Sequence, residues 1–482
     1  MDPVTAADPK RWKALAVLGV AYLMVVLDVS IVNVALPSIQ NELDFSTEDL
    51  QWVVSAYALT FGGFLLLGGR LGDLLGRRRV FMAGLALFAT FSLLCGLAVS
   101  AGMLIAARAL QGAAGAALSP SVFSIVSVTF EEGAERNKAL GILGAIAGSG
   151  AAIGVLLGGV LTEYAGWEWI FFVNVPIGFG ALFLVRRVVR ESRADGLMQH
   201  FDALGAVTVT ASLMLFVYGL TQSTRVGWGS AQTIGVLIAS AVLMAAFVVI
   251  EMRSRSALVP LKIFRRRTLT GANVIGFGVG TMVFGMFFLL SLYMQEVLGF
   301  SAVKTGIGYL AVALTAIVAS GASQNLVTRL GVKPVLTIGM VLLGSGLIYF
   351  TQVSPDGSYV GDLLPGFLLV GVGLGFSFVP VSIAALAGVT GREAGLASGL
   401  INTSQQIGGA LGLAILTTVA TTRTNGLLEE GTPRPVAMTD GFSLGFWAGV
   451  AFAAVSLVAT LALLRRSDLR ALEARPAQVP TG

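Results

Sequence analysis

The sequence has few charged residues and almost none of the residue types that build metal or catalytic centres. Only 12% of its 482 residues are charged, whereas an ordinary soluble domain has about 25%. Cys95 is the only cysteine and His200 the only histidine, which excludes a disulfide framework and a metal site built from several of either. The G-x-x-x-x-G-K-[ST] phosphate-binding loop is also missing. We therefore expect neither an enzyme nor a bound cofactor or metal.

Apolar residues dominate instead, at 55% of the chain, with a mean hydropathy of +0.85. Apolar runs of about 20 residues, bounded by charges or by Pro, Gly, Asp and Asn clusters, are typical of transmembrane helices. Fourteen such runs predict an all-α integral membrane protein. They cover approximately residues 14–36, 51–69, 80–100, 103–130, 138–162, 169–188, 203–222, 231–250, 269–294, 305–326, 334–351, 361–386, 398–421 and 441–464.

The positions of the basic residues orient these helices. If both termini are cytosolic, all but five of the 31 Lys and Arg residues lie in cytosolic segments. The exceptions are Arg108 inside a run and four residues outside the membrane, Arg225, Lys304, Arg423 and Arg434. Cytosolic loops of membrane proteins carry such an excess of Lys and Arg. The basic charge therefore indicates orientation in a bilayer rather than nucleic-acid binding, and we expect a multi-pass protein of a bacterial inner membrane.

Two ionisable residues, Asp28 and Arg108, lie well inside apolar runs. Each costs about 2.5–3.5 kcal/mol there, so such residues are usually functional. The helical rise places Asp28 roughly 12 Å and Arg108 roughly 8 Å from the outer ends of their helices, depths that allow a direct or water-bridged pair. The functional interpretation is a proton relay, and the alternative is a static ion pair that fixes helix packing. Gln111, one turn from Arg108, either contacts substrate or links helices.

The second and third runs are joined by the segment GRLGDLLGRRR, residues 69–79. Its glycines permit a tight turn, its aspartate can accept hydrogen bonds, and its arginines can anchor to anionic headgroups. The segment resembles motif A of the major facilitator superfamily, G-x-L-x-D-x-x-G-R-[RK], which implies a gating loop. The six matching residues are Gly69, Leu71, Asp73, Gly76, Arg77 and Arg78, of which all but Leu71 are assigned to the gating loop.

Further segments resemble the drug:proton antiporter family of that superfamily, whose members have fourteen transmembrane spanners. LDVSIVNVALP at 27–37 resembles its first-helix motif, and residues 104–115 resemble its motif B. WEWIFFVNVPIG at 167–178 resembles a further family segment, with Glu where Arg is usual. The resemblance covers the whole chain and implies that Arg108 takes part in proton coupling. We assign Asn33, Gln111 and Gln295 to the substrate cavity.

The fifth run contains a comb of glycines with mostly four-residue steps. Small residues of this kind let membrane helices approach closely. The comb also resembles motif C, the antiporter signature, but Ala151 and Val155 replace its two prolines. This departure leaves coupling modes other than antiport open. The glycines are Gly144, Gly148, Gly150, Gly154 and Gly158.

The resemblance implies two six-helix bundles with pseudo-two-fold symmetry plus two inserted central helices. We expect the N-terminal bundle in residues 1–190, the inserted pair in 191–260 and the C-terminal bundle in 261–482. The chain is then a monomeric, proton-coupled secondary transporter that exports amphipathic drugs or lipophilic cations by alternating access, with Asp28 and Arg108 coupling to a proton gradient. The alternative is a narrow-specificity exporter, or a proton-coupled transporter of one endogenous metabolite, lipid or antibiotic.

Overall fold

The computed structural model describes residues 9–45, 47–50, 52–130, 134–192, 202–254, 259, 261–386 and 394–464. All regular structure in these residues is helical. Eleven of the helices in this part of the chain are long and apolar enough to cross a membrane. Three more, α6, α9 and α15, coincide with the remaining apolar runs, so the fourteen predicted helices are all present. The prediction of an all-α integral membrane fold is confirmed.

The helices of the first half follow the predicted runs closely. The break between α7 and α8 at Val173 divides the sixth run into two pieces. The elements are α1 (Arg11–Glu42), the short α2 (Thr47–Leu50), α3 (Trp52–Leu75), α4 (Arg77–Gly96), α5 (Ala101–Thr129), α6 (Ala134–Tyr164), α7 (Trp169–Phe172) and α8 (Asn174–Val188).

Two further helices, α9 (Ala203–Val226) and α10 (Ala231–Arg253), precede the second half. Two helices of the second half are extended by π-helical turns, η3 and η4, at one end. The elements are η2 (Leu261–Arg265), α11 (Arg267–Leu292), η3 (Tyr293–Val297), α12 (Ala302–Leu330), α13 (Val332–Phe350), η4 (Tyr359–Leu363), α14 (Leu364–Leu386), α15 (Ala394–Glu429) and α16 (Arg434–Leu463).

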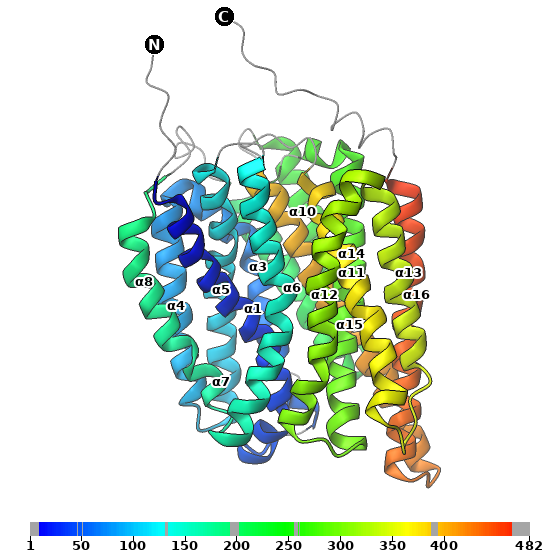
Figure 1. Ribbon diagram of the computed structural model, residues 1–482. Coiled ribbons are helices and arrows are strands. Elements are labelled where there is room, and N and C mark those ends of the chain that lie inside the picture. The colour runs from blue at the N-terminus through cyan, green and yellow to red at the C-terminus, as the bar shows by residue number, and fades with distance from the viewer. Residues whose placement is uncertain are drawn as a thin grey trace, which may run out of the picture.

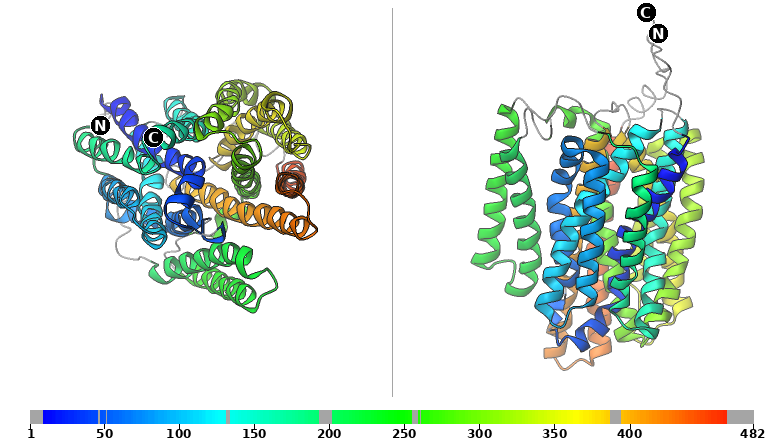
Figure 2. Two further views of the ribbon diagram at one scale, coloured as in Figure 1. Left: turned by 90° about the horizontal axis from the view of Figure 1, so that it is seen from below. Right: turned by 90° about the vertical axis from the view of Figure 1, so that its left-hand side faces the viewer.

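The helices of each half pack mainly against one another, and the halves meet chiefly along two pairs of helices. These pairs are α6 with α12 and α3 with α15. The α9–α10 pair stands at the periphery, where α9 packs on α3 and α15 and α10 packs mostly on α9 (Figure 2). The domain boundaries near residues 190 and 260 stay predictions.

The helix α1 begins and α16 ends at the same end of the bundle, which we call the terminal end (Figure 1). At the opposite, distal end, the hairpin of α15 and α16 projects beyond the neighbouring helices. Placing the terminal end in the cytosol remains a prediction, because it depends on the distribution of Lys and Arg.

The two halves are in close contact at the distal end. A Cβ added to Gly159 of α6 would lie 2.9 Å from the carbonyl carbon of Ala302 of α12, so only glycine allows this approach. One turn further on, a carboxylate oxygen of Glu163 accepts a hydrogen bond of 3.1 Å from the backbone N–H of Val303, in the first turn of α12. Free N–H groups at a helix start favour such a negative partner. The distal end is therefore closed along this seam.

Candidate functional site

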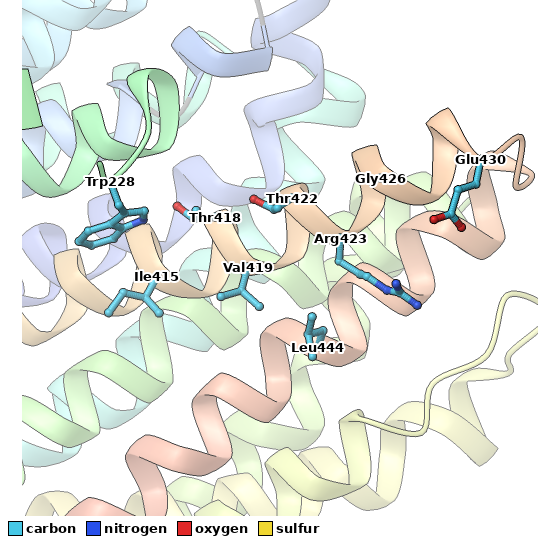
Figure 3. A pocket seen from close by; sticks show the side chains of 9 residues that line it. All are labelled: Trp228, Ile415, Thr418, Val419, Thr422, Arg423, Gly426, Glu430 and Leu444. Carbon is cyan, nitrogen blue, oxygen red and sulfur yellow. The ribbon is translucent and has the colours of Figure 1, made fainter. Parts of the chain in front are cut away.

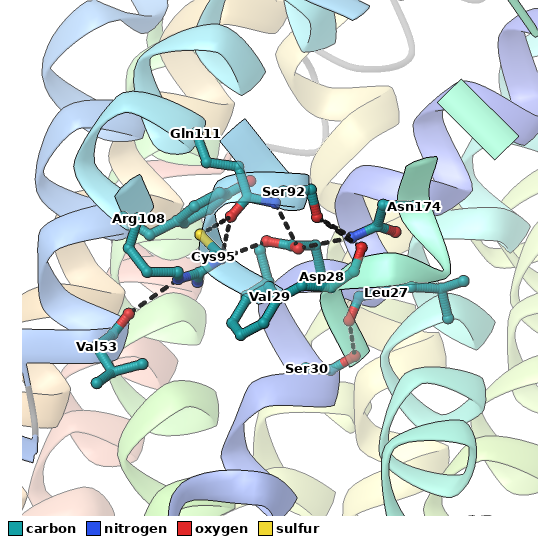
Figure 4. A network of polar contacts seen from close by, with 12 residues as sticks. Leu27, Asp28, Val29, Ser30, Val53, Ser92, Cys95, Arg108, Gln111 and Asn174 are labelled. Carbon is teal, nitrogen blue, oxygen red and sulfur yellow. Dashed lines mark hydrogen bonds and ion pairs between the residues drawn. The ribbon is translucent and has the colours of Figure 1, made fainter. Parts of the chain in front are cut away.

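Asp28 and Arg108 form a buried ion pair in the first half of the molecule (Figure 4). Nη1 of Arg108 donates to Oδ2 of Asp28 over 2.6 Å, and the two side chains are 1% and 0% exposed. Asp28 comes from the middle of α1 and Arg108 from the distal third of α5, helices whose apolar sequence otherwise holds them among hydrophobic neighbours. Of the two geometries that the sequence allows, the structure has the direct pair.

Two side-chain amides complete the shell of the Asp28 carboxylate. Nε2 of Gln111 donates to Oδ1 over 2.8 Å, and Nδ2 of Asn174 donates to the same oxygen over 2.9 Å. With Arg108, the carboxylate accepts three hydrogen bonds and donates none in this arrangement. An ionised carboxylate is an acceptor only. The cluster is therefore arranged around the charged form of Asp28.

Arg108 has several partners besides Asp28. Its Nε donates to the backbone carbonyl of Val53 over 3.0 Å, and its Nη1 also donates to Oε1 of Gln111 over 2.8 Å. The guanidinium lies 4.3 Å from the ring centroid of Tyr57, a cation–π distance. These contacts compensate part of the cost of burying a cation.

Ser92 and Cys95 of α4 contact the side-chain amides of Asn174 and Gln111. Nδ2 of Asn174 also donates to Oγ of Ser92 over 3.0 Å, and that hydroxyl donates to the carbonyl of Phe171 over 2.9 Å. The thiol of Cys95 lies 3.5 Å from Oε1 of Gln111. Because each amide has a second partner, its orientation toward Asp28 is fixed.

The helix break between α7 and α8 brings Asn174 to Asp28. Asn174 is the first residue of α8 and is 1% exposed, and Pro176 follows two positions later, in the first turn where proline is tolerated. The sequence segment around Asn174 supported the family resemblance but gave this residue no role. The available signal was an amide inside an apolar run, which is a weaker signal than a charge.

The other two residues assigned to the substrate cavity lie outside this cluster. Asn33 is partly buried, and its described hydrogen bonds go to carbonyls of its own helix, Val29 and Ser30. Gln295 lies in η3, at the distal end of α11 in the second half. Its Nε2 is buried and has no hydrogen-bond partner among the described residues. Their assignment to a substrate cavity stays a prediction.

Glycines of α6 let this helix lie directly against α1 beside Asp28. A Cβ on Gly154 would be 2.9 Å from the carbonyl oxygen of Leu27, the residue before Asp28. A Cβ on Gly158 would be 2.7 Å from the carbonyl oxygen of Ile31, and Gly150 also faces α1 closely. The glycine comb therefore fits backbone against backbone, as small residues do in membrane interfaces.

The same helix packs against the second half on its other side. Gly306 of α12 approaches Val155, where an added Cβ would lie 2.9 Å from the Val155 carbonyl oxygen. Val155 stands where motif C has a proline, and α6 runs as one helix from Ala134 to Tyr164. Gly144 and Gly148 lie on this helix, but their surroundings, like the side chain of Ala151, are outside the described residues.

The motif A turn joins α3 and α4 at the terminal end. Gly76 has a φ of 107°, a conformation that favours glycine, and an added Cβ would meet the carboxylate of Glu191. The backbone N–H of Arg78 donates to Glu191 over 3.1 Å, and its guanidinium donates to the carbonyl of Val189 over 3.2 Å. The backbone N–H of Arg77 donates to the carbonyl of Ser192. The turn is therefore fastened to the segment that follows α8.

The remaining motif A residues lie as follows. Gly69 faces α5, where Pro120 would lie 3.5 Å from an added Cβ, and the side chain of Asp73 is outside the described residues. Glu191, the acidic partner of the arginines, was not predicted, because it lies more than a hundred residues further along the chain. The gating role of the turn stays a prediction.

Comparisons with known proteins match this arrangement. The family model described as Major Facilitator Superfamily matches residues 18–413, which is more than half of the chain. The chain belongs to the major facilitator superfamily. It is therefore a membrane transporter rather than an enzyme, and the resemblance of its motifs to that superfamily is confirmed.

Relatives in this superfamily resemble the chain over most of its length. It is 38% identical over 459 residues to the puromycin resistance protein pur8 of Streptomyces alboniger, covering 95% of this chain and 91% of that protein. It is 40% identical over 420 residues to the cephamycin export protein CmcT of Amycolatopsis lactamdurans, covering 86% of each chain. The crystal structure of the human organic anion transporter MFSD10 (TETRAN) is similar in fold, with a TM-score of 0.64, 15% identity, and coverage of 94% of this chain and 99% of that chain.

Proposed function

We propose that this transporter exports amphipathic drugs or lipophilic cations from a bacterial cytoplasm in exchange for protons. The proposal rests chiefly on one observation, the wholly buried cluster in which Asp28 is held by Arg108, Gln111 and Asn174. The names of the two relatives, a resistance protein and an export protein, support export of antibiotics. The terminal end faces the cytosol in this scheme.

Protonation of Asp28 provides the coupling step. A neutral carboxyl group loses its charge–charge attraction to Arg108. Its O–H group is a hydrogen-bond donor, but its three partners are donors as well, so the O–H finds no acceptor among them. Arg108 keeps Val53 and Tyr57 as partners, whereas α1 loses its strongest link to α5. The contact between α1 and α5 thus differs in strength between the two protonation states.

Alternating access then depends on the distal seam. Because α6 packs against α1 on one side and against α12 on the other, a shift of α1 reaches the contact between the two halves. In this scheme the seam of Gly159 and Glu163 with α12 separates when the distal end opens. Asp28 releases its proton inward after the seam has closed again, as in the structure.

Proton movement in proteoliposomes tests the proposal. Vesicles with an imposed pH gradient receive a lipophilic cationic dye such as ethidium, and wild type is compared with Asp28→Asn. We expect the dye to dissipate the gradient through wild type and not through the variant. Dissipation by both proteins alike would exclude coupling through Asp28. If neither moves protons with ethidium, puromycin or a cephamycin, the proposal fails as stated.

A second candidate is export of a single compound. It is supported by Ala151 and Val155 at the positions of the motif C prolines, and by relatives that are named for one compound each. A panel of structurally unrelated substrates in the same assay separates the two. Proton movement with only one member of the panel favours the narrow exporter, and movement with several favours the multidrug exporter.

A further inference from the structure

A groove lies between the inserted helix pair and the second half, at the distal end. It has a volume of about 670 Å³ and runs along α15, with Trp228 of the α9–α10 loop on one side and Leu444 of α16 on another (Figure 3). The groove is separate from the Asp28 cluster, which lies among helices of the first half. The inserted pair contributes Trp228, from the loop between its two helices, to one side of the groove.

The lining becomes charged toward the distal end of α15. Ile415 and Val419, together with Trp228 and Leu444, form an apolar section. Thr418 and Thr422 alternate with these residues, and the charged residues come last, with Arg423 and then Glu430. From Ile415 to Glu430 the helix rises about 22 Å. A ligand that fits this gradient has an apolar body and a charged end that points away from the bundle.

The length of α16 places the groove at one boundary of the hydrocarbon core. Leu444 lies 19 residues before Leu463, the last residue of α16, a rise of about 29 Å, which is close to the thickness of the hydrocarbon core. Asp440, which pairs with Arg423, is one turn beyond Leu444. Arg423 therefore lies at headgroup level and Glu430 further out.

The two charged residues can recognise a zwitterionic headgroup. Nε and Nη2 of Arg423 donate to Oδ2 of Asp440 over 2.8 and 2.7 Å, and its Nη1 has no protein partner among the described residues. Glu430 is exposed and forms no ion pair within the same residues. A phosphate suits the free guanidinium donor and the threonine hydroxyl beside it. An ammonium group beyond the phosphate suits Glu430.

We propose that the groove is a binding site for a phospholipid whose headgroup carries a phosphate followed by an outermost amine, as in phosphatidylethanolamine. The order of charges decides between headgroups: the cation Arg423 lies nearer the apolar section and the anion Glu430 lies further out, as phosphate and ammonium follow the acyl chains. An anionic headgroup without an amine gains nothing from Glu430. The site thus ties the inserted pair to α15 and α16 through a lipid.

Quenching of Trp228 by brominated lipids tests this site in the purified full-length protein. Phosphatidylethanolamine and phosphatidylglycerol with the same brominated acyl chains are titrated separately, and the signal of Trp228 is taken as the difference between wild type and Trp228→Phe. We expect half-maximal quenching at a several-fold lower concentration of phosphatidylethanolamine. Equal concentrations for both lipids, or a preference for phosphatidylglycerol, would overturn the proposal.

Adjacent glutamates at the end of α15 provide a matched control. Glu430→Gln should abolish the preference for phosphatidylethanolamine, whereas Glu429→Gln should keep it, because Glu429 does not line the groove. An equal effect of both substitutions would assign the preference to general surface charge and refute the site. Displacement of the lipid by ethidium would make the groove a substrate site and also refute it.

A third variant fills the groove without changing a charge. Leu444→Phe should weaken quenching of Trp228 by both lipids, with thermal unfolding monitored to show that the fold is kept; unchanged quenching would count against binding in the groove. These assays need no proton gradient, so their outcome is independent of the proposed antiport.

Discussion

Asn174 on α8 donates a hydrogen bond of 2.9 Å to Asp28 on α1, across 146 residues of sequence. The same amide nitrogen contacts Ser92 on α4, so one side chain joins three helices at the only carboxylate that is fully buried in the described core of the first half. Hydrogen bonds to charged groups contribute about 1.5–3 kcal/mol each. Asn174 therefore contributes to the charged state of Asp28 nearly as directly as Arg108 does.

We predict that Asn174→Ala impairs proton-coupled transport by about tenfold or more, since 1.4 kcal/mol corresponds to a factor of ten. The measurement is substrate-driven proton movement in proteoliposomes at equal protein content. Thr90→Ala is the control, because Thr90 is exposed on α4 and its hydroxyl bonds a carbonyl of its own helix, Ala86, in the described structure. Equal losses in both variants would show that Asn174 has no special relation to Asp28.

The buried ion pair predicts strong coupling between its partners. Arg108→Gln leaves Asp28 buried without its countercharge and should lower the free energy of unfolding by about 3–5 kcal/mol. The double variant with Asp28→Asn should be more stable than Arg108→Gln alone, because the uncompensated charge is gone. Denaturation of the four proteins in one detergent measures this cycle. Additive effects of the two substitutions would contradict the direct pair.

Close approach of α6 to α1 predicts that Gly154 tolerates no side chain. Gly154→Ala places a methyl group 2.9 Å from the Leu27 carbonyl oxygen, and such overpacking costs about 1–3 kcal/mol. Gly235→Ala in α10 is the control, because an added Cβ there meets nothing within 4 Å. We expect Gly154→Ala to lower both the unfolding temperature and the transport rate, and Gly235→Ala to change neither. If Gly154→Ala had no effect, the two helices would have to be further apart than described.

Much of this architecture can be predicted from the sequence, because apolar length and Lys/Arg placement are strong signals. The helices, and the depths that let Asp28 meet Arg108, follow from runs of residues and a fixed helical rise. Asn174 and Glu191 could not be predicted as partners, since each contact depends on how distant helices pack. The peripheral position of α9 and α10 also depends on helix packing, which the apolar runs alone do not determine.

Closure of the distal end predicts that a covalent link across it blocks transport. With Cys95 replaced by Ala, Glu163→Cys and Val303→Cys place one thiol on each side of the seam, at residues joined by a hydrogen bond of 3.1 Å from the Val303 backbone to the Glu163 carboxylate. A short cross-linker should hold the halves together there. Reduction of a cleavable linker should restore transport. The control is Ser212→Cys with Ser240→Cys, whose hydroxyls lie 3.4 Å apart between α9 and α10. Because that link stays within the peripheral pair, it should leave transport intact, whereas equal inhibition by both links would show that the distal seam has no gating role.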